Sequence, residues 1–156
     1  MSKTGIFPGS FDPFTIGHAD IVRRALPLLD RLVIGVGVNE HKQGISSATQ
    51  RAEVIASLYA EEPKVKVVTY KDLTIDLAHR EGARYIIKGV RSVKDFEYER
   101  GQAEINRMIG DVDTIFLFAD PSLSSVSSSM VRELSHFGKD ITPFIPTRET
   151  IKSKEK

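Results

Sequence analysis

Short apolar runs alternate along this chain with longer segments in which apolar residues recur every three or four positions. Runs with few polar interruptions are typical of strands buried on both faces of a parallel sheet. They occupy residues 4–8, 31–38, 65–70, 85–87 and 114–118. The periodic segments predict helices, which begin near residue 17, at residues 47, 73, 92 and 130, and near residue 147.

Several of the expected helix boundaries carry local signals. Pro27 ends the first helical pattern, because proline lacks the N–H that a helix interior needs. Residues 47–50, Ser-Ala-Thr-Gln, fit a capping box that opens the second helix. Gly82 and Gly138 close two later helices, since glycine readily adopts the left-handed conformation found at helix ends.

The alternation of strands and helices predicts an α/β fold. We expect a doubly wound sheet of five parallel strands, with right-handed crossovers and helices on both faces. A ligand crevice is expected where the carboxyl ends of the strands meet. Because no internal repeat or long linker divides the sequence, it predicts a single domain over residues 1–156, with a charged tail from about residue 153.

Composition narrows the classes of function. The 156 residues carry a formal net charge of +1 and include no cysteine, which excludes disulfides, thiolate metal sites and cysteine nucleophiles. Without a large field of one sign, neither nucleic acid nor a membrane is required as a partner. No apolar run approaches the roughly 20 residues of a membrane span, and the first strand begins too early for a signal peptide. We therefore expect a cytoplasmic protein.

The most informative chemistry follows the first strand, in Gly-Ser-Phe-Asp-Pro-Phe-Thr-Ile-Gly-His at residues 9–18. This loop leads into a helix whose first turn has unpaired N–H groups and a partial positive charge, which together favour an anion. Gly17 allows a ligand to approach the backbone, and His18 supplies a donor from the same turn. Ser10 offers a hydroxyl and an N–H to a second anionic group. The segment predicts a phosphate site.

Three other polar segments follow strands in the same way. Lys42 lies in the loop after the second strand, residues 88–91 (Lys-Gly-Val-Arg) end the fourth, and a serine cluster at 122–129 follows the fifth, with Arg132 one helical turn further on. Taken singly they also fit a solvated loop lysine, a basic turn and a flexible linker. Because the carboxyl ends of parallel strands share one edge of a sheet, we expect them to converge with the first loop.

The loop at residues 9–18 resembles the T/H-x-G-H signature of the nucleotidylyltransferase superfamily, with Thr15, Gly17 and His18 in the motif positions. The resemblance extends along the chain to one family. Residues 88–91, Asp-Phe-Glu-Tyr-Glu at 95–99, Asn-Arg at 106–107 and Val-Ser-Ser-Ser at 126–129 are similar to the bacterial phosphopantetheine adenylyltransferases. The segment 95–99 in particular separates this family from other enzymes with the T/H-x-G-H signature.

This resemblance implies a Rossmann-like enzyme that transfers AMP from ATP to 4′-phosphopantetheine, giving dephospho-coenzyme A and pyrophosphate with Mg²⁺. It also implies a homohexamer. By position, the catalytic residues would be His18, Lys42 and Arg91, and the acceptor would be bound by Ser10, Lys42, Thr74 and Lys88. The residues implied for ATP are Ser10, Phe11, His18, Gly89, Val90, Arg91, Glu99, Leu123, Ser124, Ser125, Val126, Ser127, Ser128 and Ser129.

The chain departs from the family pattern at three of these positions. Lys88 stands where arginine is usual, so the charge is kept and the bidentate fork is lost. Ser10 replaces a common threonine and preserves the hydroxyl, while Thr74 replaces leucine or methionine. No carboxylate pair has clear metal-ligand spacing, so we expect Mg²⁺ to be held largely by ATP phosphates and water.

The residue inventory suits direct transfer, in which the acceptor phosphate attacks the α-phosphorus of ATP in line and no covalent enzyme intermediate forms. Two alternatives remain. One is another nucleotidylyltransferase of the same superfamily, acting on glycerol 3-phosphate or nicotinamide mononucleotide. The other is a non-catalytic nucleotide sensor, which would bind ATP without releasing pyrophosphate.

Overall fold

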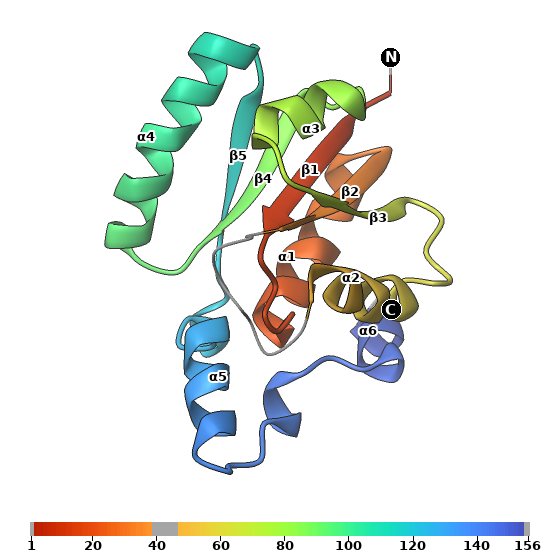
Figure 1. Ribbon diagram of the computed structural model, residues 1–156, viewed down its shortest axis with the longest axis vertical. Coiled ribbons are helices and arrows are strands. Elements are labelled where there is room, and N and C mark those ends of the chain that lie inside the picture. Colours follow the sequence, from red (N-terminus) through yellow and green to blue (C-terminus); the bar gives the residue numbers. More distant parts are fainter. Residues whose placement is uncertain (1, 39–46, 155–156) are drawn as a thin grey trace.

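The computed structural model describes residues 2–38 and 47–154 and contains a parallel sheet with strand order β3-β2-β1-β4-β5 (Figure 1). The strands are β1 (Thr4–Gly9), β2 (Arg31–Gly37), β3 (Val65–Tyr70), β4 (Tyr85–Val90) and β5 (Asp113–Phe118). The α-helices are α1 (Ile16–Ala25), α2 (Ala48–Leu58), α3 (Thr74–Arg80), α4 (Val93–Gly110), α5 (Ser128–His136) and α6 (Arg148–Lys154). Three 3₁₀ turns complete the described elements: η1 (Leu26–Leu28), η2 (Pro121–Leu123) and η3 (Thr142–Phe144).

Alternate residues of each central strand enter two separate cores. In β1, Ile6 packs with residues of α3, whereas Phe7 packs with residues of α1 and α2. In β4, Ile86 and Ile87 divide in the same way, and all four side chains are at most 4% exposed. Burying one such side chain contributes roughly 1.5–3 kcal/mol. The two cores explain why the strands read as continuous apolar runs, and they confirm the doubly wound α/β fold.

The strand order places a topological switch at the centre of the sheet. From β1 the chain crosses to β2 and then β3 on one side, and it returns to the other side of β1 to form β4 and β5. Both β2 and β4 pair with β1 in parallel, so connections leave its carboxyl end in opposite directions. Such a switch opens a crevice beyond the carboxyl ends of the central strands. The crevice lies between the loops that follow β1 and β4.

Local signals set two helix starts earlier than the hydrophobic period predicted. Helix α1 begins at Ile16, because the side chain of Thr15 caps it and accepts hydrogen bonds from two backbone N–H groups. Helix α5 begins at Ser128, because Ser127 caps it by accepting from the N–H of Met130. The serine cluster is therefore partly a helix start.

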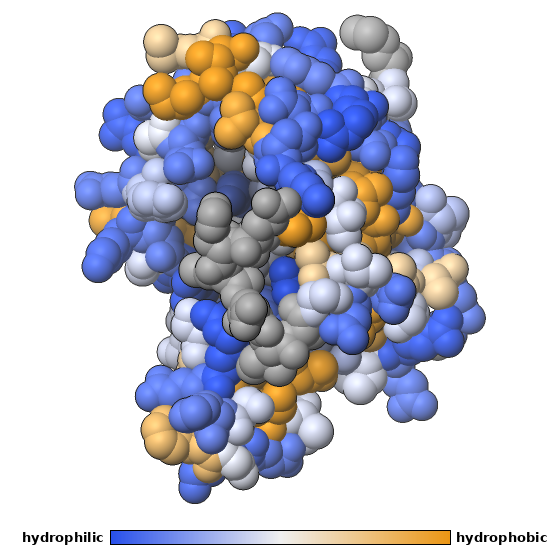
Figure 2. Space-filling view, in the orientation of Figure 1, coloured by the Kyte–Doolittle hydropathy of each residue, from blue (hydrophilic) through white to orange (hydrophobic). Residues whose placement is uncertain are grey.

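Helix α4 covers β4 and β5 on one face and leaves apolar side chains on the other. Phe96 packs edge-on against Phe116 of β5, with 5.5 Å between ring centroids. The exposed apolar side chains of α4 are Val93, Tyr98, Ile105, Met108 and Ile109, each more than half exposed. Figure 2 shows a hydrophobic group over the carboxyl end of this helix, at the top of the view. Within residues 2–38 and 47–154, no helix has the length and apolar character to cross a membrane.

Candidate active site

A cleft of about 350 Å³ opens at the carboxyl ends of β1, β4 and β5. Its walls come from the loop between β1 and α1, the end of β4, the first half of α4, η2 and the start of α5. The sequence-predicted site residues that line it are Ser10, Phe11, His18, Lys88, Gly89, Arg91, Glu99, Leu123, Val126, Ser127, Ser128 and Ser129. Segments that are far apart in the sequence therefore meet at one edge of the sheet, as the strand pattern predicted.

His18 is fixed by a capping box at the start of α1. The Thr15 backbone N–H donates to His18 Nδ1 over 2.9 Å, and Thr15 Oγ1 accepts from the N–H of Gly17 and of His18 at 3.2 and 3.4 Å. Histidine thus takes the place that glutamate or glutamine occupies in the usual capping box. Because Nδ1 accepts from a backbone N–H, the proton of the neutral ring lies on Nε2. At the cleft wall, the Nε2–H of His18 is therefore available to donate a hydrogen bond.

Aromatic rings pack against the imidazole of His18. Phe14 stacks on His18 at 5.4 Å between centroids, and Phe11 meets it edge-on at 5.0 Å. Burial among these rings, with a smaller effect of the nearby Arg91 guanidinium, lowers the pKa of His18 from 6.5 to about 4. At neutral pH the imidazole is therefore uncharged, and its Nε2–H can donate a hydrogen bond without a positive charge on the ring.

The lowered pKa predicts a pH effect on folding. The folded state favours neutral His18, so between pH 6.5 and about 4 the unfolded state binds more protons, and the free energy of unfolding falls as the pH drops through this range. We expect imidazole resonances of His18 to titrate near pH 4 in NMR spectra, assigned with His18→Asn, whose unfolding should depend less on pH. A midpoint near 6.5 would contradict the inferred environment.

Two cations of the cleft are balanced by carboxylates on α4. Lys88 Nζ lies 3.3 Å from Glu99 Oε2, and Arg91 Nε lies 3.5 Å from Asp95 Oδ2. All four side chains line the cleft. Their pairing places positive charge beside the α1 N-terminus while limiting repulsion between the cations.

The α5 side of the cleft is shaped by serine hydroxyls. Asp120 caps η2 by accepting from the N–H of Ser122 at 2.9 Å, and Ser127 caps α5. The hydroxyl of Ser128 donates to the Pro13 carbonyl oxygen over 2.8 Å. A second helix N-terminus is therefore held beside the first, and their N–H groups and partial positive charges favour an extended anion such as a polyphosphate.

Some predicted residues lie elsewhere. Val90 is buried in the sheet, the Ser124 hydroxyl donates to the Pro121 carbonyl, and Ser125 is exposed; none of them lines the cleft as described. Thr74 begins α3, where its hydroxyl lies 3.1 Å from Tyr70 Oη, also off the described wall. Lys42 lies outside the described residues.

The cleft also includes Gly9 and Gly17 of the predicted phosphate loop, and residues to which the sequence analysis gave no catalytic or substrate-binding role, among them Pro8, Thr15, Asp95 and Ala119. Thr15 had a usable signal, because it precedes His18 by three residues as in a capping box. Arg132, which the sequence analysis named with the serine cluster, also lines the cleft; it lies four residues after Ser128, so both fall on the same helix face.

Gly17 gives a test of close ligand approach. A Cβ at Gly17 would make only ordinary contacts, 3.4 Å from Thr15 Oγ1 and 3.5 Å from the Val126 carbonyl oxygen, so alanine fits the folded protein. We expect Gly17→Ala to keep the wild-type melting temperature and to raise the KM for ATP by about tenfold, because the methyl group enters a cleft built for backbone approach. Gly101→Ala, at an open position on α4, is the matched control. An unchanged KM would remove Gly17 from the ligand wall.

No group of three or more histidine, aspartate or glutamate side chains in the described parts of the chain is arranged to hold a metal ion. The two cleft carboxylates, Asp95 and Glu99, are paired with cations. The described residues therefore do not fit a metal site made by protein ligands alone.

Comparisons with known proteins agree with this geometry. A family model described as cytidylyltransferase-like matches residues 6–134. The chain is 51% identical over 144 residues to a phosphopantetheine adenylyltransferase of Phocaeicola vulgatus, covering 92% of this chain and 95% of that protein. It is 50% identical to the protein of the same name from Porphyromonas gingivalis, covering 90% of this chain and 92% of the relative.

Solved structures share the fold at low identity. A bifunctional NMN adenylyltransferase/ADP ribose pyrophosphatase from Francisella tularensis superposes with a TM-score of 0.70 at 16% identity. The match covers 93% of this chain and 45% of that protein, so this chain spans less than half its length. A structure of the same bifunctional protein in complex with AMP and a manganese ion gives a TM-score of 0.68.

Proposed function

We propose how this chain, which belongs to the phosphopantetheine adenylyltransferase family, carries out the reaction of that family. The chain transfers the adenylyl group of ATP to 4′-phosphopantetheine, giving dephospho-coenzyme A and pyrophosphate in the penultimate step of coenzyme A biosynthesis. One observation supports the mechanism above all. His18 lines the cleft at the first turn of α1, with Nδ1 bound to the backbone and Nε2 carrying the proton.

The reaction needs no covalent intermediate on the protein. An oxygen of the 4′-phosphate attacks the α-phosphorus of ATP, and the bond from that phosphorus to the bridging oxygen of the β-phosphate breaks. Pyrophosphate leaves with the electron pair. His18 donates from Nε2 to an equatorial oxygen of the pentacovalent centre, assisted by the partial positive charge at the start of α1. The neutral imidazole suits this task, because it gives a hydrogen bond without transferring its proton.

The two substrates divide the cleft. We place ATP against Gly89, Arg91, Glu99 and the segment 123–129, where the α5 N-terminus and the Arg91 guanidinium favour the triphosphate. We place 4′-phosphopantetheine against Ser10 and Lys88, with Lys42 and Thr74 further along the arm. Val90, Ser124 and Ser125 would then act through their backbone or through the shape of their loops.

We propose Mg²⁺ as the divalent ion. The described residues lack a three-ligand cage, so phosphate oxygens and water would supply its coordination. The structure of the Francisella protein in complex with AMP and a manganese ion supports a divalent ion on this fold. We also propose that the chain forms a single catalytic domain, which is supported by a family model that extends over most of the sequence. We propose the cytoplasm as its location.

The reaction is tested by following pyrophosphate release from ATP and Mg²⁺ with each of three acceptors. We expect release with 4′-phosphopantetheine and none with glycerol 3-phosphate or nicotinamide mononucleotide. Release with another acceptor would keep the mechanism and overturn the substrate. ATP binding without release for any acceptor would favour a nucleotide sensor.

We propose that the chain forms a homohexamer and that the exposed apolar face of α4 takes part in the assembly. Met108, on that face, is 79% exposed in the single chain, and Ile105 and Ile109 of the same helix are more than half exposed; a group of exposed apolar side chains is typical of an interface. Met108→Glu is expected to yield smaller species in analytical ultracentrifugation, whereas Phe137→Glu, at the C-cap of α5 where the side chain is 69% exposed, should leave the assembly intact. Dissociation by the second variant alone would place the interface elsewhere.

A further inference from the structure

The loop between β1 and α1 is held from outside by donors on two helices. Arg51 of α2 donates from Nε to the carbonyl oxygen of Ser10 over 2.8 Å. From α5, Arg132 donates from Nη1 to the carbonyl oxygen of Asp12 over 2.7 Å, beside the bond from Ser128 to Pro13. Three carbonyls within four residues are thus fixed, although these residues belong to no helix or strand with its own ladder.

The backbone of this loop needs such support. Phe11 has a φ of +49°, in the left-handed region that a bulky side chain rarely adopts, at a cost on the order of 1–3 kcal/mol. That conformation persists only where surrounding contacts enforce it. It sets the direction of the chain four residues before Thr15, which holds the ring of His18. A displacement of this loop would therefore also displace Thr15 and the imidazole of His18.

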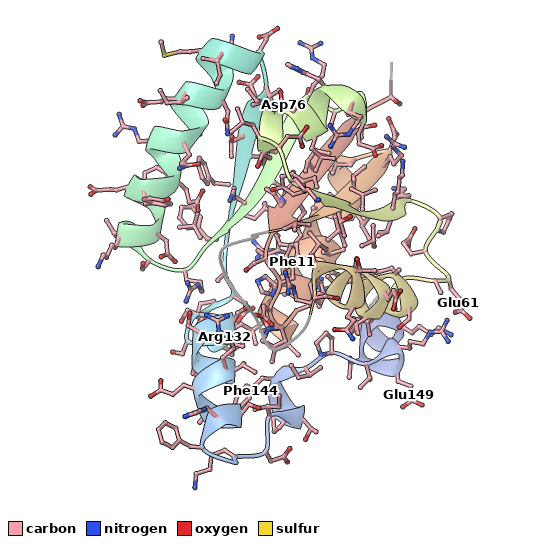
Figure 3. All side chains as sticks on the ribbon, in the orientation of Figure 1. Phe11, Glu61, Asp76, Arg132, Phe144 and Glu149 are labelled. Atoms are coloured by element: carbon pink, nitrogen blue, oxygen red, sulfur yellow. The ribbon has the colours of Figure 1, made fainter. Side chains whose placement is uncertain are left out.

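Arg132, like Ser128, joins α5 to the first loop, and it differs from Ser128 because its guanidinium makes two hydrogen bonds. While Nη1 binds the Asp12 carbonyl, Nη2 donates to the hydroxyl of Ser129 over 3.1 Å. The side chain is half-buried, lines the cleft, and lies at the end of α5 nearest the strands, toward the labelled Phe11 (Figure 3). The bond to Asp12 joins the first turns of α5 to the loop that precedes His18, and the bond to Ser129, within α5, fixes the plane of the guanidinium.

We propose that Arg132 is a positioning residue of the adenylyl transfer, which sets the separation between the α1 and α5 N-termini so that the triphosphate spans them with its α-phosphorus at His18. The inference rests on the proposed function of the cleft. Arg132 acts through Asp12 and Ser129 and needs no contact with substrate. Its fork geometry matters, because a lysine ammonium is a point charge on a flexible stem and does not hold two fixed acceptors in one plane.

We expect the change in KM to be confined largely to ATP. Arg132→Met keeps an unbranched stem and removes both hydrogen bonds. We expect it to lower kcat/KM for ATP by about 10–100-fold, since small misplacements of reacting groups have effects of this size. The KM for 4′-phosphopantetheine should change by less than about threefold, because its phosphate lies on the Ser10 and Lys88 side. Arg132→Lys should recover only part of the loss.

The experiment compares wild type, Arg132→Met and Arg132→Lys with the control Glu133→Gln, which changes charge at the next, exposed position of α5. Steady-state rates are measured for both substrates, ATP binding is measured by calorimetry without acceptor, and melting temperatures are recorded. A specific loss for ATP in Arg132→Met, with partial rescue by lysine and an unchanged control, supports the proposal. Equal losses for both substrates that follow the melting temperature would make Arg132 merely structural.

Two further outcomes are distinguishable. Full activity of Arg132→Lys would show that charge suffices and would overturn the two-armed geometry. Full activity of Arg132→Met would overturn the proposal altogether, while the wild-type rate measured alongside it would leave the proposed function standing. A wild type that binds ATP but releases no pyrophosphate would instead refute the proposed function.

Discussion

Replacing His18 by alanine is expected to lower the turnover number by about 10²–10³-fold, roughly 3–4 kcal/mol of transition-state stabilisation, with a smaller change in ATP binding. The physical reason is the position of its donor. Nε2–H acts where charge develops on the α-phosphate oxygens, and the backbone N–H of Thr15 fixes the ring orientation in advance. A contact that strengthens only in the transition state affects kcat more than KM.

Steady-state pyrophosphate release for the variant and for His136→Ala provides the measurement. His136 lies near the end of α5 and is exposed, so its removal controls for the loss of an imidazole as such. A turnover number within threefold of wild type for His18→Ala would remove this side chain from the mechanism. Calorimetry with ATP would separate that outcome from a loss of binding.

Replacing Arg91 by methionine is the second large change, with kcat/KM for ATP expected to fall by about 10²-fold. Arg91 supplies a charged, forked donor at the cleft, and the Asp95 carboxylate directs it over 3.5 Å. The same guanidinium contributes to the lowered pKa of His18, so its loss should also raise that pKa toward the ordinary value of 6.5. The variant therefore has a kinetic and a spectroscopic signature.

Arg107→Met is the matched control for this variant. Arg107 sits at the other end of α4 and pairs with Asp113 at 2.8 Å on the exposed surface, a kind of ion pair that contributes about 0–1 kcal/mol. It should change neither the rate nor the titration of His18. If Arg91→Met left the kinetics unaltered but shifted the histidine titration, Arg91 would be a neighbour of the site without a role in binding ATP.

Much of the architecture followed from local patterns. Strands such as β2 and β4 are apolar on both faces, so their burial could be predicted from the sequence. Helix ends were less predictable. The capping box at Thr15 was missed because histidine stands where glutamate or glutamine is usual, and α5 was expected to begin near residue 130 although it begins at Ser128.

The finer geometry of the cleft depends on contacts that no local pattern encodes. Lys88 and Glu99 were each assigned to a substrate, but their 3.3 Å pairing follows from how α4 packs on β4. The bond from Arg132 to Asp12 joins positions 120 residues apart. The left-handed backbone of Phe11 is likewise imposed by tertiary contacts, since phenylalanine has no intrinsic preference for it.

The long separation of Arg132 from Asp12 has a consequence for folding. The hydrogen bonds from α5 to the first loop join residues that are 115 and 120 positions apart. The entropy lost on bringing two such residues together grows with the length of chain between them. These hydrogen bonds are favourable only after the strands between the two segments have assembled and have brought α5 close to the loop between β1 and α1. A nascent or partly folded chain can hold the sheet before it holds the cleft. Catalytic activity therefore requires α5 to have packed against the first loop, and it appears later in folding than the sheet does.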